Sequence, residues 1–391
     1  MKKLMVLLLA IILTLPAAAL GAEEGDGVSP DQILESQMKE LELSEIQSFI
    51  DQIEQEVGQY VPDLSIDKII SDVRKGELNL DFGAFLSGMV DYLLHELITH
   101  LALLGRLVVL AVISAVLYNL LDAFEGTTGK LASTIVYLVL IAIALGSFTA
   151  ALSIGRQAID NMVGFVQALL PVLLTLLAAI GGLSSAAILH PFIIAALGLL
   201  GTLIKNFVFP LIFLSAVLSI VNHISDKFKV SQLAGLLKEI GVASLGIFLT
   251  LFVGFLGLQG IAGAVADSVT LKTAKFMTGT FVPVVGKVFA DALEVIIGTS
   301  LLLKNAVGLL GVIVLFVLCA FPVIKIMAMA LVYRVAAALV QPIGDSEVAK
   351  ALQTMGSALT LVFAAVAGVG LMFFMAVSVI VGLGNINVML R

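Results

Sequence analysis

An almost uninterrupted apolar stretch runs from residue 163 to residue 222, with Pro171, Pro191 and Pro210 inside it. Apolar runs of about 18 or more residues are long enough to cross roughly 30 Å of hydrocarbon as helices, and helices satisfy their own backbone hydrogen bonds there. The whole chain of 391 residues is 60% hydrophobic and 13% charged, and its mean hydropathy is +1.15. A soluble domain is usually far less apolar. The sequence therefore predicts an all-α, polytopic helical membrane protein.

Two proline motifs recur at the same spacing and indicate a two-fold internal repeat. The motifs Pro171-Val172 and Phe209-Pro210 are matched 112 residues later by Pro283-Val284 and Phe321-Pro322. The repeat units would be 163–266 and 275–381, and an even number of crossings in each makes the two copies parallel. We expect Pro171, Pro191 and Pro210 to separate neighbouring segments, with about eight to ten membrane segments in all. The predicted segments lie at 97–121, 131–153, 163–180, 186–204, 206–222, 241–266, 275–293, 298–316, 318–339 and 356–381.

The N-terminus has the composition of a secretory signal peptide. Lys2 and Lys3 precede an apolar core at Leu4–Leu15, and small residues follow it. This is the order of the charged, apolar and cleavage regions of such a peptide. We predict that residues 1–22 are the signal peptide, with an uncleaved signal anchor as the alternative. In either case the segment that follows is expected outside the cytoplasm.

The charges divide the remaining chain into two regions. Residues 23–96 carry 18 Asp or Glu and 4 Lys or Arg, a net charge of −14. Residues 97–391 carry 10 acidic and 15 basic residues. We therefore predict an exported acidic region at 23–96 and a polytopic membrane domain at 97–391.

Helical patterns fill the acidic region. Apolar residues with roughly helical spacing run from Leu34 to Val57, and Pro62 ends that pattern. A shorter amphipathic piece covers 66–73, and Asp81 can cap a third helix. The apolar stripes of these helices must be covered by each other, by the membrane domain or by a partner. The acidic region can be interpreted either as a docking element for a partner or as a cap that folds on its own chain.

The connector 223–240 carries three lysines against two acidic residues. The positive-inside rule therefore places it in the cytoplasm. Counting crossings from an outside N-terminus also places it there. Arg391 is then expected outside.

Charged residues inside membrane segments need a protein partner, a watery cavity or a route to the interface. Lys287, Asp291 and Glu294 lie four and three residues apart and form one polar stripe, the candidate intramembrane site. The alternatives are a self-paired stripe between helices and a surface amphipathic helix. For Lys325 and Arg334 we expect side chains that extend to the interface.

No catalytic or cofactor-binding signature is present. His95 and His100 are five residues apart, whereas the zinc-binding HExxH helix needs four, so we predict no metal site. We expect instead interfacial anchoring, with Asp91–His95 and Glu96–His100 as pairs four residues apart. There is no phosphate-binding loop, no Ser/His/Asp set and no basic cluster for nucleic acid. The single cysteine, Cys319, excludes an intrachain disulfide. The sequence indicates neither an enzyme nor a bound cofactor.

The order of these parts resembles the stage III sporulation protein AE family of endospore-forming bacteria. The resemblance rests on the signal peptide and on four strings in the mature chain. They are Val61-Pro62-Asp63-Leu64, Ile69 to Glu77, Leu169-Leu170-Pro171-Val172 and Asn222-His223-Ile224-Ser225. The family offers no catalytic residues to carry over.

The resemblance implies a subunit of a secretion-like channel complex that joins mother cell and forespore. Such a subunit would sit in the mother-cell-derived membrane around the forespore, with other stage III proteins, and would be needed for late gene expression in the forespore. An ATPase that supplies energy would be another chain. The alternative is a self-sufficient secondary transporter, for which repeats, proline-interrupted helices and a polar intramembrane site are typical.

Overall fold

The computed structural model describes residues 35–39, 41, 43–75, 81–122, 127–224, 230–281, 286–343 and 346–389. All regular elements in these ranges are helical, which confirms the predicted all-α class. The residues Leu41–Arg391 form one compact unit, and Met1–Glu40 form a separate unit in which residues 35–39 are helical. The predicted signal peptide, 1–22, lies outside the described residues.

The predicted amphipathic helices of the acidic region are present. They are α3 (Ser44–Val57), the short 3-10 helix η2 (Gly58–Tyr60), α4 (Ile66–Lys75) and α5 (Phe82–Thr99). The apolar stripe of α3 is buried, with Ile46, Ile50 and Ile53 at most 3% exposed. Phe49 on the same helix packs edge-to-face on Phe165, with ring centroids 5.6 Å apart. The membrane bundle therefore covers the stripe of α3.

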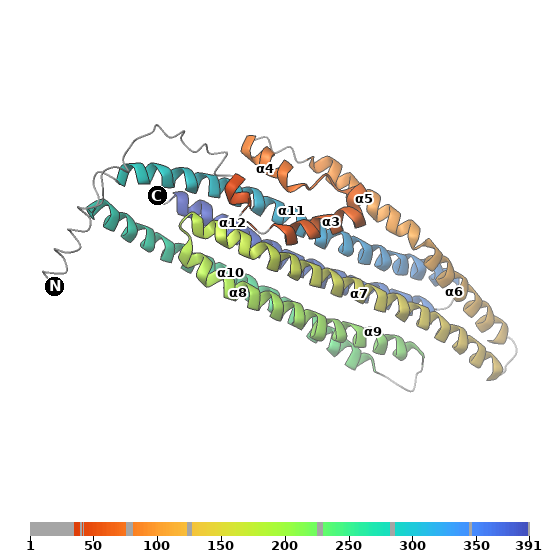
Figure 1. Cartoon of the computed structure of the whole chain (residues 1–391). Coiled ribbons are helices and arrows are strands. Elements are labelled where there is room, and N and C mark those ends of the chain that lie inside the picture. The colour runs from red at the N-terminus through yellow and green to blue at the C-terminus, as the bar shows by residue number, and fades with distance from the viewer. Residues whose placement is uncertain are drawn as a thin grey trace. The chain divides into compact units, whose positions relative to one another are not determined.

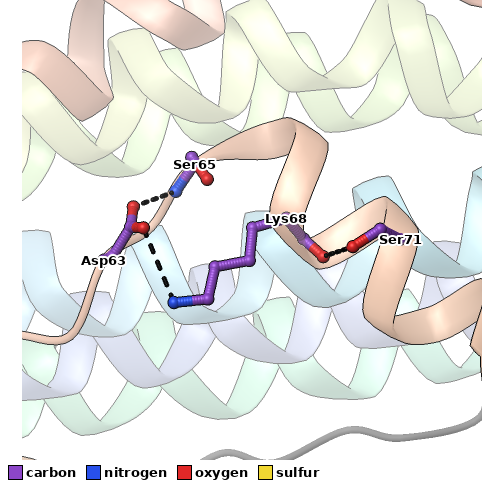
Figure 2. Close-up of polar contacts among 4 residues, drawn as sticks. All are labelled: Asp63, Ser65, Lys68 and Ser71. Atoms are coloured by element: carbon purple, nitrogen blue, oxygen red, sulfur yellow. Dashed lines mark hydrogen bonds and ion pairs between the residues drawn. The ribbon is translucent and has the colours of Figure 1, made fainter.

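An aspartate turn fixes the start of α4 (Figure 2). The carboxylate of Asp63 accepts a hydrogen bond from the Ser65 N–H at 3.0 Å and lies 3.5 Å from the Lys68 ammonium. One turn later, the Ser71 hydroxyl donates to the Lys68 carbonyl at 2.9 Å. Such Asx turns hold the chain at a helix entry. With its entry fixed, α4 turns its isoleucine face toward α11 (Gly286–Val340).

Three long helices form the centre of the bundle: α7 (Thr127–Ala179), α11 and α12 (Ser346–Met389). On one side, α10 (Ser231–Phe281) packs on α8, α9 and α12; on the other, α5 and α6 pack on α11 (Figure 1). The remaining elements are α6 (Leu101–Asp122), α8 (Leu183–Leu203), the π-helix η3 (Ile204–Val208), α9 (Phe209–Ile224) and the 3-10 helix η4 (Gln341–Ile343). The largest fully buried aromatic side chains are Phe148, Phe165, Phe209, Tyr333 and Phe373.

The number of membrane segments is lower than predicted. Five helical stretches in the described residues are long and apolar enough to cross a membrane: 135–179, 183–222, 231–267, 295–340 and 347–383. A sixth is possible if α5 and α6, which meet at a 40° bend, count as one span. The difference arises because single helices continue through several positions where the sequence indicated a boundary. The polytopic membrane class is confirmed, and the count of eight to ten is too high.

Polar and proline residues do not end these helices. Arg156, Asp160 and Asn161, which the sequence indicated as a polar break, lie inside α7, as does Pro171. Pro322 lies inside α11 in the same way. Neighbouring helices can compensate for the hydrogen bond that a proline removes. The expectation that Pro171 separates two segments is therefore wrong.

Glycine ends α7 instead. Gly181 has φ 94°, its N–H donates to the Ala178 carbonyl at 2.9 Å, and the Gly182 N–H donates to the Leu177 carbonyl at 2.9 Å. This is a Schellman motif, which glycine favours because the left-handed conformation costs it little. Asp267 of α10 then caps α8 by accepting from the N–H groups of Ser184 and Ser185 at 2.9 and 3.1 Å.

The long helices exceed the thickness of a bilayer. The 53 residues of α7 and the 55 of α11 rise about 80 Å each, against roughly 30 Å of hydrocarbon. Each helix is therefore longer than a single crossing of the hydrocarbon requires. The repeat units 163–266 and 275–381 stay a prediction, because Pro283 and the side chains around it lie outside the described residues.

Candidate functional site

The polar stripe predicted from the sequence lies at the start of α11. Lys287, Asp291 and Glu294 occupy its first turns, where the helical backbone places their Cα atoms on one side. Their side chains lie outside the described residues. The stripe therefore stays a hypothesis, and charged residues elsewhere in the bundle define a second candidate site.

A buried carboxylate joins α5 to α11. Glu96 is 5% exposed, and its Oε1 lies 3.5 Å from the Lys325 Nζ on α11. Its Oε2 lies 3.6 Å from Nε2 of His100. A buried carboxylate is unfavourable unless positive or hydrogen-bonding groups compensate its charge. These three residues, the Glu96 cluster, tie the acidic amphipathic region to the membrane bundle.

The helix junction positions this cluster. The His100 N–H donates to the Glu96 carbonyl at 3.0 Å, and the Leu104 N–H donates to the His100 carbonyl at 3.0 Å. The Glu96–His100 pair predicted from the sequence is confirmed. Among the residues that the structure describes, no three His, Cys, Asp or Glu side chains are grouped so as to hold a metal ion.

An open pocket of about 360 Å³ lies beside the cluster, between α3, η2, α5, α7 and α11. Three of these helices each contribute two residues spaced four apart, which puts both on one helix face. The pairs are Tyr92 with Glu96, Gln157 with Asn161, and Phe321 with Lys325. The end of α3 and η2 add Glu56, Gln59 and Tyr60. The pocket therefore combines both signs of charge, three amides, the rings of Tyr60, Tyr92 and Phe321, and the imidazole of His95.

Aromatic packing sets the pocket wall. Tyr92 packs edge-to-face on Tyr60 and on Phe321, with ring centroids 5.2 and 4.8 Å apart. Such pairs are stabilising beyond the area that they bury. An ideal Cβ at Gly88 would collide with the Tyr60 carbonyl, so glycine lets η2 approach α5. The wall is thus formed by segments far apart in the sequence.

A second ion pair lies at the π-helix. The Lys205 ammonium, in η3, contacts Asp160 of α7. The π-helix immediately precedes α9, which begins at Phe209-Pro210. Single π-helical turns are frequent at functional sites. Asp160, one of the polar residues that the sequence indicated as a break between segments, therefore binds a neighbouring helix.

Lys304 is a buried charge that the sequence analysis missed. It is fully buried in α11, and its Nζ donates to the Val381 carbonyl of α12 at 2.6 Å. The signal that could have identified it is its position as the one lysine of the predicted segment 298–316. Lys325 and Arg334 also have protein partners, Glu96 and the Thr360 hydroxyl. That their side chains extend to the membrane interface stays a prediction.

Comparison with known proteins agrees with the resemblance in the sequence. Residues 64–384 match the family described as Stage III sporulation protein AE. The Stage III sporulation protein AE of Bacillus subtilis (strain 168) is 41% identical over 394 residues, which cover 99% of this chain and 98% of the relative. No solved structure matches the chain. The chain, a polytopic helical membrane protein, therefore belongs to the stage III sporulation protein AE family.

Proposed function

We propose that this protein is a non-enzymatic integral membrane subunit of a secretion-like channel complex that joins mother cell and forespore and is required for late gene expression in the forespore. The observation that carries the proposal is the similarity to a stage III sporulation protein along 99% of the chain. The five apolar helices of membrane length support an integral membrane location. The membrane in question is the mother-cell-derived membrane around the forespore.

The arrangement of the helices supports a topology with the mature N-terminus outside the cytoplasm. The bent pair of α5 and α6, then α7, then α8 with α9, then α10, α11 and α12 make six successive rods that reverse direction at each turn (Figure 1). An outside start puts the basic connector 223–240 in the cytoplasm and Arg391 outside, in agreement with the positive-inside rule.

The acidic amphipathic helices are the proposed contact for exported domains of partner proteins. The apolar face of α3 is turned to the bundle, so Glu45, Asp51 and Glu54 remain exposed. Acidic surfaces steer basic partners. The other proposed partners are stage III membrane proteins and an ATPase on another chain.

The alternative, a self-sufficient secondary transporter, draws support from the pocket at the Glu96 cluster and from the stripe of Lys287, Asp291 and Glu294. Affinity purification from sporulating cells in mild detergent separates the two functions. A channel subunit should co-purify with other stage III proteins, and the isolated chain in liposomes should support no solute or ion flux. Recovery without partners, together with flux by the isolated chain, would contradict the proposal and favour the transporter.

A further inference from the structure

The pocket at the Glu96 cluster has a buried carboxylate oxygen with no hydrogen bond. Glu96 Oε2 and His100 Nε2 are both buried and 3.6 Å apart, and neither has a hydrogen-bond partner. A buried carboxylate oxygen without a donor is unfavourable, and charged N–H donors compensate it best. This oxygen faces His100, which does not line the pocket. The other oxygen, Oε1, lies 3.5 Å from the pocket-lining Lys325, so a donor on a small solute would approach the carboxylate from the Oε1 side.

One part of the pocket wall suits an ammonium group. Glu56 and Glu96 supply two carboxylates, and the half-buried Tyr60 supplies an aromatic ring, whereas Tyr92 and Phe321 are buried behind it. Aromatic faces attract organic cations, and carboxylates accept their N–H bonds. The two acids come from different elements, α3 and α5, and Glu56 also accepts a hydrogen bond from the Gln52 side chain at 3.1 Å.

The remaining wall suits a carboxylate. The Lys325 side chain is 39% exposed, and its ammonium lies 3.5 Å from Glu96 Oε1. Gln157 and Asn161 lie one turn apart on α7 and add amide donors. A solute with only a positive charge would be repelled by Lys325, and a solute with only a negative charge would be repelled by Glu56 and Glu96.

We infer that this pocket binds a small zwitterionic solute of amino-acid size, with its ammonium toward Glu56 and Glu96 and its carboxylate toward Lys325 and the α7 amides. The volume of about 360 Å³ accommodates such a molecule. The pocket lies between the acidic region and the bundle, so occupancy adds a bridge across that junction. This binding activity goes beyond the proposed role as a complex subunit.

Thermal unfolding of the full chain in lipid nanodiscs tests the inference with three probes of similar size: alanine, propylammonium and propionate. A ligand that binds only the folded protein raises Tm. At equal ionic strength, saturating alanine should raise Tm by about 2 °C or more, and the two singly charged probes should not. Equal shifts with propylammonium or propionate, or no shift with alanine, would overturn the inference.

Two exposed lining residues keep the test independent of folding. Glu56→Gln and Gln157→Leu alter the pocket at exposed positions, and each should weaken the apparent affinity for alanine about tenfold, as loss of a charge-assisted or buried hydrogen bond does. Glu54→Gln, on the same helix but outside the pocket, is the matched control and should bind alanine normally. Unchanged affinity in both pocket variants would refute the site, whereas partner recovery from sporulating cells reports separately on the proposed function.

Discussion

The Glu96–Lys325 contact is the residue pair that most directly joins the acidic region to the bundle, because the two side chains come from α5 and α11. Glu96 is buried and Lys325 is 39% exposed. Removing the lysine leaves the buried carboxylate uncompensated, whereas replacing both residues with apolar ones also removes the cost of burying that charge. We expect Glu96→Leu and Lys325→Leu each to destabilise the protein. The double variant should lose less stability than the sum of the two single losses. The coupling energy in unfolding by denaturing detergent should be about 1–3 kcal/mol.

Glu347 and Lys350 provide the control cycle. This pair is exposed, with the two charged atoms 2.9 Å apart, and should couple by less than about 1 kcal/mol. Additive effects of Glu96→Leu and Lys325→Leu, with no coupling, would show that the buried contact does not join the two helices.

Gly88 is the glycine whose replacement should damage the pocket wall. A methyl group there collides with the backbone carbonyl of Tyr60, which cannot rotate away. We expect Gly88→Ala to cost about 1–3 kcal/mol through overpacking, measured as a lower Tm and faster proteolysis near residues 58–65. In Gly105→Ala the added atom meets open space, so this control should be neutral or slightly stabilising. Equal behaviour of the two variants would contradict the close approach of η2 to α5.

Sequence alone located some of these side chains but did not pair them across the fold. The four-residue spacing predicted the Glu96–His100 pair, because neighbours on one helix face follow from periodicity. Lys325 lies 229 residues from Glu96, and no local pattern encodes such a contact. Lys304 was missed for the same reason, since its partner is a backbone carbonyl of α12.

At the scale of single elements, the entry of α8 depends on a residue of another helix. Asp267 accepts two backbone N–H bonds at the start of α8. Asp267→Ala should leave these donors unsatisfied and cost about 1–3 kcal/mol, seen as a lower Tm and greater protease sensitivity around residues 180–186. Asp267→Asn keeps an acceptor oxygen and should lose clearly less. Equal losses in the two variants would indicate that the charge matters and the cap does not.

Helix boundaries were the least predictable feature of the elements. Asp81 was correctly predicted as a helix cap, since it caps α5, and Pro62 follows the end of η2 as predicted. Caps and prolines at the ends of short helices act locally, which makes them predictable. Pro171 and Pro191 were misread as divisions between segments, because a membrane bundle stabilises helices through such residues. The Gly181-Gly182 turn is the local signal that could have located the end of α7.

At the scale of the whole molecule, the exposed acids of α3 should govern contact with exported partner domains. Reversing Glu45, Asp51 and Glu54 to lysine leaves the buried isoleucines in place, so the protein should still accumulate in the membrane. We expect recovery of exported partners to fall several-fold and its salt dependence to weaken, because surface attraction is screened. Glu239→Lys, exposed on α10, is the control. Unchanged recovery in the α3 variant would leave the acidic helices as a cap on their own chain.

The side of the membrane on which one turn lies distinguishes the arrangement of six rods from the ten segments predicted from the sequence. The segment count puts the turn near residue 183 on the same cytoplasmic side as residue 231. In the structure a single pair of helices, α8 and α9, separates Leu183 from Ser231, so the two lie on opposite sides if this rod crosses the bilayer.

Labelling of single cysteines with a membrane-impermeant maleimide in intact vegetative cells is the direct measurement. In a Cys319→Ala background, Leu183→Cys, at a position 64% exposed, should react before lysis, and Ser231→Cys should react only after it. Reaction of both positions before lysis, or of neither, would contradict the six-rod topology.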